Sequence, residues 1–257
     1  NVEAFDRPFE RFFGWWRRCS INIAHYGAYP PSRAPQATAH QYGGVMLLSV
    51  NDGASRLHSS GRDPTGLGRW AWSRYQGAAG HALRIVTAYR CNPSSPKKAR
   101  SVYNQQQSYF LSKNDDRCPR EAFWLDLIAE IKSWMQIVEG TDGGRDHIVI
   151  GVDMNADVRD TANTHHLRSL GLTELITHRH GFNGPGTCDK GSAPIDGLFV
   201  TSGLLNSKCG YRPFVFDHRM LWMDINLEDI FGLEADISPR LHPQRLTNDD
   251  RRTRNRY

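Results

Sequence analysis

Short apolar runs, and stretches in which apolar and polar positions alternate, recur along the chain, and both patterns predict β-strands. Residues 43–50 (GGVMLLSV) form one such run. Residues 68–90 predict a hairpin, because Trp70 and Trp72 alternate with small residues, a glycine-rich turn follows, and a second apolar run ends in TAYR. Further strands are predicted in the segments HIVIGVD, PIDGLFVTS and HRMLWMDINL, which begin at residues 147, 194 and 218.

A period of about 3.6 residues predicts two amphipathic helices. The clearer one covers residues 119–139, where apolar side chains recur on one face: Phe123, Trp124, Leu127, Ile128, Ile131, Trp134, Met135 and Val138. The other covers residues 4–19, in which aromatic side chains are mixed with arginines. That stripe suits core packing or stacking on bases, and the helical pattern favours packing. Residues 167–176 predict a short helix and a turn, so helices and strands are interleaved as in a mixed α/β protein.

The composition changes near Glu228. The segment from there to Tyr257 contains few large apolar residues and ends in an arginine-rich run, so it cannot bury a core by itself. We therefore expect a folded domain over residues 1–227 and a basic tail or linker over residues 228–257. The tail suits a phosphate-binding arm or a solvated connector, and the second interpretation is favoured because basic runs are readily solvated.

The length and hydrophobic content allow a single large α/β core, and the net charge and cysteine pattern bear on the possible partners and compartment. The 257 residues are 39% hydrophobic with a formal net charge of +5, which permits a nucleic-acid partner without requiring one. The five cysteines are scattered and include no C-x-x-C pair. They argue against a disulfide framework or zinc finger and favour a reducing, intracellular compartment. No apolar run approaches the ~18 residues of a membrane span, so no membrane partner is expected.

Acidic, amide and imidazole side chains stand at the ends of the predicted strands. They are Tyr89, Asn92, Asp153, Asn155, Asp196, Asp217 and His218. Sheets commonly present catalytic side chains there, because the strands fix the backbone while the loops admit substrate. Carboxylates can hold a divalent cation, and carboxylate, amide and imidazole groups together can activate water and stabilise a phosphoryl charge. Singly, such residues are typical of turns and polar surfaces; together they favour phosphodiester hydrolysis.

The segments GVDMNAD, PIDGLFV and FDHRML, in this order, resemble the endonuclease/exonuclease/phosphatase superfamily, whose members have the DNase I-like fold. QYGGVMLLS, GRWAWSRY and RIVTAYRCN are similar to its earlier strands, so the resemblance covers residues 41–227. TAYR, the long helix and PIDG look most like the endonuclease domains encoded by retroelements. The resemblance implies an α/β fold, namely a DNase I-like four-layer sandwich of two mixed β-sheets flanked by helices.

The resemblance also implies roles for the matching residues. Asp153 would position or activate the attacking water, and Asn155 would hydrogen-bond the scissile phosphate. Tyr89 and Asn92 would contact the same phosphate.

The remaining implied roles concern the imidazole and the metal. Asp196 would accept a hydrogen bond from His218 and fix its orientation, which agrees with the way a carboxylate selects an imidazole tautomer. His218 would face the phosphoryl oxygen. Asp217 would lie beside the metal together with Asp153, and the implied cofactor is Mg²⁺ or Mn²⁺.

One part of the family pattern is missing from this chain. The family begins with strands that carry an Asn and a Gln-Glu, and this Glu is a principal metal ligand; Glu3 instead precedes a helical pattern. We therefore expect a fragment that begins just after those strands, with the first strands missing. Such a fragment would have little activity alone, and its upstream segment would restore Mg²⁺-dependent cleavage.

The favoured function is a metal-dependent DNA endonuclease, the nicking domain of a retroelement polyprotein that continues into further domains such as a reverse transcriptase. A nuclear location would follow from that origin. Arg69, Trp70 and Arg90 are the candidate DNA-binding residues beside Asn92, because basic and aromatic side chains suit a polyanion with stackable bases. Two alternatives stay open: a phosphatase of the same superfamily acting on phosphoinositides or other small phosphoesters, and a non-catalytic nucleic-acid-binding remnant.

Overall fold

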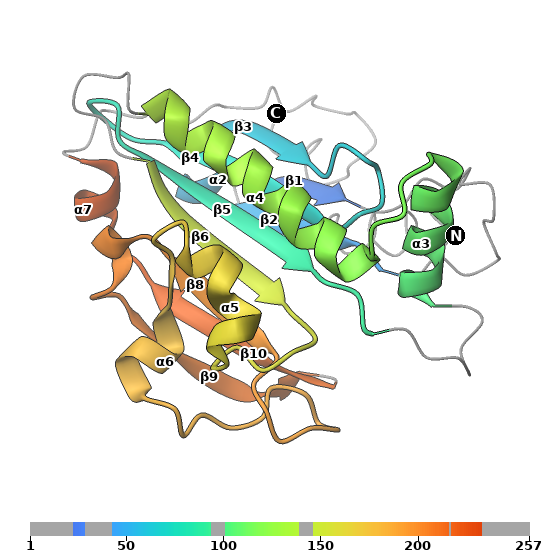
Figure 1. Ribbon diagram of the computed structural model, residues 1–257. Helices are drawn as coiled ribbons and strands as arrows, with labels where there is room; N and C mark the ends of the chain where they lie inside the picture. The colour runs from blue at the N-terminus through green and yellow to red at the C-terminus, as the bar shows by residue number, and fades with distance from the viewer. Residues whose placement is uncertain (1–22, 29–42, 94–100, 139–145, 216, 233–257) are drawn as a thin grey trace, which may run out of the picture.

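The chain has a mixed α/β fold in which helices flank a six-stranded mixed β-sheet (Figure 1). The structure is a computed structural model that describes residues 23–28, 43–93, 101–138, 146–215 and 217–232. The helix predicted over residues 4–19 lies outside them. The sheet has the order β3-β4-β5-β6-β8-β7. Its strands are β3 (Leu57–Arg62), β4 (Trp70–Gln76), β5 (Ala82–Tyr89), β6 (Asp146–Asp153), β7 (Thr173–Glu174) and β8 (Asp196–Val200).

The centre of the sheet matches the elements that the sequence predicts. β4 and β5 form the predicted antiparallel hairpin, and β5 then pairs in parallel with β6. A parallel pair needs a crossover connection, which here includes α4 (Pro119–Val138), the predicted long helix. α4 runs along one face of the sheet (Figure 1).

Two further antiparallel pairs of strands complete the β structure. β1 (Ile23–Ala28) pairs with β2 (Val45–Val50), and β9 (Lys208–Val215) pairs with β10 (His218–Asp224). In the described residues, the expected second sheet thus consists of two separate two-stranded pieces. The other helices are α2 (Asp52–Ser55), α3 (Val102–Ser112), α5 (Thr161–Arg168), α6 (Leu175–His180), α7 (Leu227–Phe231) and the 3-10 turn η1 (Ser202–Leu204).

Each face of the central sheet buries its own apolar cluster, because successive side chains of a strand point to opposite faces. On one face, α4 and α5 pack on side chains such as Val86 and Ile150. On the other face, side chains such as Leu83 and Val149 pack with residues of α6, α7 and the β9–β10 pair. The sheet is therefore the rigid middle layer from which the loops at its edges project.

The packed part of the chain extends past the predicted boundary at residue 227. Ile230 and Phe231 of α7 are buried in the second apolar cluster, and the Ala78 N–H donates to the Phe231 carbonyl. Packed structure thus reaches Phe231 at least. None of the helices in the described ranges combines the length and apolar character that a membrane crossing requires.

Candidate phosphoester-hydrolysing site

Three predicted site residues occupy a single row across the central strands. In the sheet register, Tyr89 of β5 pairs with Asp153 of β6, and Asp153 pairs with Asp196 of β8. β5 and β6 are parallel and both end at this row, whereas β8 is antiparallel and begins there. Because residues in one register row project to the same side of a sheet, their side chains are brought together at its edge.

His218 joins this row from the β9–β10 pair. One ligand atom from each of Asp153, Asp196 and His218 lies within 4.8 Å of the other two. Nδ1 of His218 is 2.8 Å from Oδ2 of Asp196, which is the Asp–His pair that the sequence predicts. Elsewhere in the described residues no other group of three acidic, histidine or cysteine side chains comes this close.

A tight turn after β6 fixes Asn155 beside the row. The Asn155 N–H donates to Oδ1 of Asp153 at 2.9 Å, and the side-chain amide of Asn155 donates to the Arg90 carbonyl at 2.7 Å. Asn155 has a φ of 47°, a left-handed conformation that asparagine tolerates better than most residues. The segment DMNAD therefore forms both a turn and a bridge to the end of β5.

The charges of the site are coupled through burial and proximity. Burial, and then the Asp196 carboxylate, raise the pKa of Asp153 to about 6. Burial opposes protonation of His218, but the hydrogen bond and charge of Asp196 outweigh it and raise the pKa of the imidazole. Burial and the Asp153 charge raise the pKa of Tyr89 and keep its hydroxyl protonated. The site thus offers a carboxylate that accepts protons readily, beside an imidazole whose protonated form is stabilised by the Asp196 carboxylate.

A buried threonine positions Asp196 and was not predicted. Oγ1 of Thr187 accepts hydrogen bonds from the N–H groups of Ile195 and Asp196, at 2.9 and 3.1 Å. The Thr187 carbonyl accepts from the Arg219 N–H at 2.7 Å, which ties the same loop to β10. The segment FNGPGTC predicts only a turn, and the one local signal for Thr187 is a polar residue closing that glycine-rich stretch.

The glycine after Asp196 is required by packing. A Cβ at Gly197 would lie 2.9 Å from the Phe199 ring and 3.1 Å from the Val158 side chain. The backbone can follow the sheet here only with a residue that has no side chain. The segment PIDG therefore places the Asp196 carboxylate at the start of a strand, next to a glycine whose surroundings are tightly packed.

Two predicted site residues, Asn92 and Asp217, are exposed. The Asp217 side chain is exposed, and it is absent from the group whose ligand atoms lie within 4.8 Å of one another. Its backbone carbonyl accepts from the Asp189 N–H. Asn92 is exposed in the loop after β5. The predicted metal position of Asp217 is therefore not supported by the geometry.

The prediction that Arg69 and Trp70 contact DNA is wrong, because both residues are fully buried. Nε of Arg69 pairs with Asp63 at 2.7 Å and its Nη2 pairs with Asp126 at 2.9 Å. The indole N–H of Trp70 donates to Glu130 of α4 at 2.6 Å. The basic and aromatic residues at the start of the hairpin therefore hold α4 on the sheet instead of meeting solvent.

The donor set fits a hard divalent cation. Asp153 and Asp196 bring two carboxylates close to each other, and their repulsion contributes to the raised pKa of Asp153. A cation between them would relieve that repulsion, and carboxylate oxygens are the ligands that Mg²⁺ prefers. Asp153 and Asp196 are thus the residues that would hold a metal, and the imidazole of His218 lies at the same position.

Several solved structures are similar to this chain at low identity. The human Nocturnin catalytic domain has 13% identity and a TM-score of 0.48, covering 92% of this chain and 75% of that chain. The Xenopus laevis APE2 catalytic domain has 13% identity and a TM-score of 0.48, covering 79% and 76%. An endonuclease/exonuclease/phosphatase family protein from Bacteroides thetaiotaomicron has 9% identity and a TM-score of 0.31, covering 55% and 46%.

No protein-family model matches the chain, and no curated protein sequence matches it either. Because the structural neighbours named above have identities of 13% or lower and TM-scores below 0.5, the chemistry of the site is inferred from the side chains of this chain.

Proposed function

We propose that this protein hydrolyses phosphodiester bonds with the help of a divalent cation, and that it acts on DNA as the nicking domain of a retroelement protein. The observation that carries the proposal is the group of Asp153, Asp196 and His218, whose ligand atoms lie within 4.8 Å of one another at the ends of neighbouring strands. Two carboxylates and an imidazole at one point suit hydrolysis of a phosphoester better than a purely structural role, since the two carboxylates repel each other.

The side chains supply the steps of an in-line hydrolysis. Asp153 accepts a proton from the attacking water while the water oxygen bonds to phosphorus and the bond to the leaving oxygen breaks; the leaving oxygen takes a proton from solvent water. His218 is held by Asp196 in the tautomer that places its proton on Nδ1, and in its protonated form Nε2 donates to a phosphoryl oxygen. The neutral Tyr89 hydroxyl and the second amide N–H of Asn155 add donors for the phosphate.

A cation held by Asp153 and Asp196 would supply positive charge next to the phosphoryl oxygens. The protein contributes the orientation: the sheet register fixes both carboxylates, and Thr187 holds the backbone at Asp196. The net charge of +5 favours a polyanionic substrate such as DNA.

The test is nicking of supercoiled plasmid by the full-length protein in the presence of Mg²⁺ or Mn²⁺. We expect nicking by the wild type and its loss in Asp153→Ala and His218→Ala. Lys132→Ala, an exposed substitution on α4, serves as the matched control and should nick normally. A folded full-length protein that leaves the plasmid intact, or nicking that survives both site substitutions, would overturn the proposal. Release of phosphate from a small phosphomonoester without nicking would overturn the assignment to DNA.

A further inference from the structure

Two arginines beside the site have no acidic partner. Arg90 directly follows Tyr89 at the end of β5, and Arg120 is the second residue of α4. Within the described ranges no carboxylate lies within ion-pair distance of either residue. Five other arginines there do pair with carboxylates, namely Arg69, Arg74, Arg84, Arg117 and Arg159.

Neutral groups hold both guanidinium groups in place. Nε of Arg90 donates to the Arg120 carbonyl at 3.3 Å, and its guanidinium carbon lies 5.6 Å from the centre of the Trp124 ring. Nη1 of Arg120 donates to the Cys91 carbonyl, and Nη2 donates to the Asn155 carbonyl at 3.4 Å. Every hydrogen-bond acceptor here is a backbone carbonyl, so the contacts fix the position of the two charges without compensating them.

The uncompensated charge has an energetic cost. Burial, and then the charge of Arg120, lower the pKa of Arg90 to about 10. Burial also lowers the pKa of Arg120. Nη1 of Arg90 is buried and has no hydrogen-bond partner. Two partly buried like charges at one place are unfavourable unless an anion joins them.

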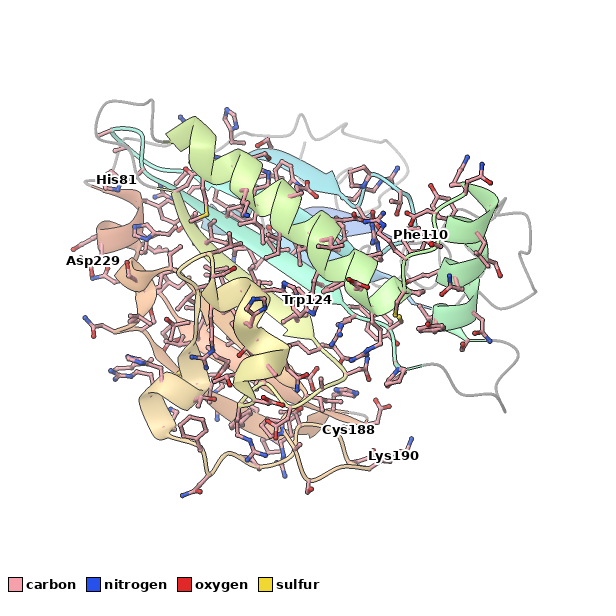
Figure 2. All side chains as sticks on the ribbon, in the orientation of Figure 1. His81, Phe110, Trp124, Cys188, Lys190 and Asp229 are labelled. Atoms are coloured by element: carbon pink, nitrogen blue, oxygen red, sulfur yellow. The ribbon has the colours of Figure 1, made fainter. Side chains whose placement is uncertain are left out.

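The arginine pair lies next to the catalytic row. Arg120 contacts the carbonyl of Asn155, two residues after Asp153. The Arg90 N–H donates to the Asp153 carbonyl at 2.9 Å. Trp124, on the same side, lies on α4 facing α5 (Figure 2). An anion held by the pair would therefore sit beside a phosphate held at Asp153, Asp196 and His218.

A purely structural role explains only half of this arrangement. Hydrogen bonds from Arg120 to two carbonyls tie the start of α4 to the loops after β5 and β6. A neutral side chain such as glutamine could donate similar bonds without bringing a second positive charge next to Arg90. The two adjacent positive charges therefore indicate a position that binds an anion. Guanidinium groups are well suited to bind phosphate.

We propose that Arg90 and Arg120 together bind the phosphate of a nucleic-acid strand adjacent to the scissile phosphate. This inference rests on the proposed function and adds to it a second position at which the protein binds a phosphate of the strand. The site would take a strand with at least two consecutive phosphates, in preference to a small phosphoester that carries one. Arg90 was a predicted substrate-binding residue; Arg120 was not.

Binding of a fluorescently labelled oligonucleotide, measured by anisotropy in EDTA at several salt concentrations, tests the pair without any cleavage. We expect Arg90→Gln and Arg120→Gln each to weaken binding about tenfold and to reduce the slope of log K against log salt by about 1. Arg74→Gln is the matched control, because Arg74 pairs with Asp146 at the opposite end of β6. It should change affinity less than about twofold. If all three variants lost the same binding affinity, the change in net charge alone would explain the effect, and the inference would be overturned.

A second measurement places the contact on the strand, and its wild-type series does not depend on how the variants fold. A series of oligonucleotides carries one neutral methylphosphonate at successive positions. For the wild type, we expect one or two adjacent positions to weaken binding, and at those positions Arg120→Gln should cause no further loss. A wild type that tolerates the neutral linkage at every position would overturn the inference.

The two proposals fail separately. Loss of the arginine effect leaves metal-dependent nicking untouched, whereas a protein that nicks no DNA can still show the position-dependent loss of binding in EDTA.

Discussion

For Asp153, the ionised form suits the proposed chemistry, whereas the protonated form contributes more to the stability of the fold. Burial and the neighbouring Asp196 raise its pKa to about 6, compared with an ordinary value of 3.8. A carboxyl with a raised pKa stabilises the folded state fully below the unfolded pKa, and that contribution is lost as the pH rises through the folded pKa. The ionised form that the proposed hydrolysis needs is therefore the form that the fold holds at a cost.

Asp153→Asn should remove this cost. The wild type should lose unfolding free energy between pH 4 and pH 8 by up to about 3 kcal/mol more than the variant, since each unit of pKa shift corresponds to ~1.4 kcal/mol. Asparagine can still accept the hydrogen bond from the Asn155 N–H, so the turn is kept. Denaturant unfolding at several pH values in EDTA measures the difference.

Asp146→Asn in the same strand is the control, because it should change the stability at neutral pH in the opposite direction. Its carboxylate pairs with Arg74 and Arg84 at 2.9 and 3.2 Å, so its loss should destabilise the protein at neutral pH by on the order of 3 kcal/mol. Equal effects of the two substitutions at pH 8 would contradict the role given to Asp153.

Asp196 should set the protonation of His218. In Asp196→Asn the imidazole loses its charged partner, so its raised pKa should fall, as an NMR titration of the His218 ring protons would show. Asp217→Asn is the matched control: Asp217 acts on His218 only through its charge and more weakly than Asp196, so the pKa should fall less. A titration unchanged by Asp196→Asn would refute the coupling.

At the residue scale, the sequence was informative where a motif is local and uninformative where a partner is distant. The three segments GVDMNAD, PIDGLFV and FDHRML led to Asp153, Asp196 and His218, which the structure brings together. The buried Arg69 pairs with Asp63, six residues away, and with Asp126, 57 residues away in the chain, and nothing near Arg69 signals the distant partner. The position of Arg120 beside the site could not be predicted for the same reason, because its contacts to Cys91 and Asn155 exist only after β5 and β6 pair.

At the scale of elements, Glu130 fastens α4 to the β4–β5 hairpin. Its carboxylate accepts the indole N–H groups of Trp70 and Trp72, both at 2.6 Å. Burial raises the pKa of Glu130 while the two indole bonds oppose this. One acidic side chain thus satisfies two N–H donors in the interface between helix and sheet.

Glu130→Ala should destabilise the protein by about 2–3 kcal/mol, because two partly or fully buried indole donors lose their acceptor. Glu130→Gln keeps one acceptor oxygen and should fall between the wild type and the alanine variant. Lys132→Ala, exposed on the same helix, should change the unfolding free energy by less than about 0.5 kcal/mol. Chemical denaturation measures the unfolding free energy of all three variants. A glutamine variant no more stable than the alanine variant would contradict the pairing of Glu130 with the two indole N–H groups.

The elements that periodicity predicts are those with strong apolar patterns. β5, β6 and α4 bury long apolar runs and were recognised, whereas several elements were missed, among them α3, β3 and β9. α3 (VYNQQQSYFLS) is mostly polar, and the main sequence cue for its start is Ser101, whose Oγ accepts the Asn104 N–H. β3 (LHSSGR) is an edge strand with one large apolar residue. β9 contains Gly210 and Pro213, which disfavour a strand on propensity alone.

At the scale of the whole molecule, α7 closes the end of the sheet opposite the site. Phe231 is buried beneath Arg56, whose guanidinium carbon lies 4.9 Å from the ring centre. A Cβ at Gly77 would lie 2.4 Å from the Phe231 carbonyl oxygen. The turn between β4 and β5 therefore admits α7 only because a glycine stands there.

Phe231→Ala should lower the unfolding free energy by about 3–4 kcal/mol, the usual cost of removing a buried aromatic ring. Gly77→Ala should also destabilise, since the new methyl group meets backbone. Leu227→Ala, on the same helix but 49% exposed, should have an effect below about 1 kcal/mol. Thermal and denaturant unfolding measure these changes, and a wild-type stability for Phe231→Ala would show that α7 is not docked as described.

The shared register row of Tyr89, Asp153 and Asp196 has a consequence for refolding. A slip of one residue between β6 and either neighbour would turn that partner's side chain to the opposite face of the sheet. The partners are also far apart in sequence, and such long-range pairings form slowly. A chain could therefore collapse with its helices formed and still lack the site. Recovery of phosphate-binding capacity would then report correct strand alignment, later than signals from helix content.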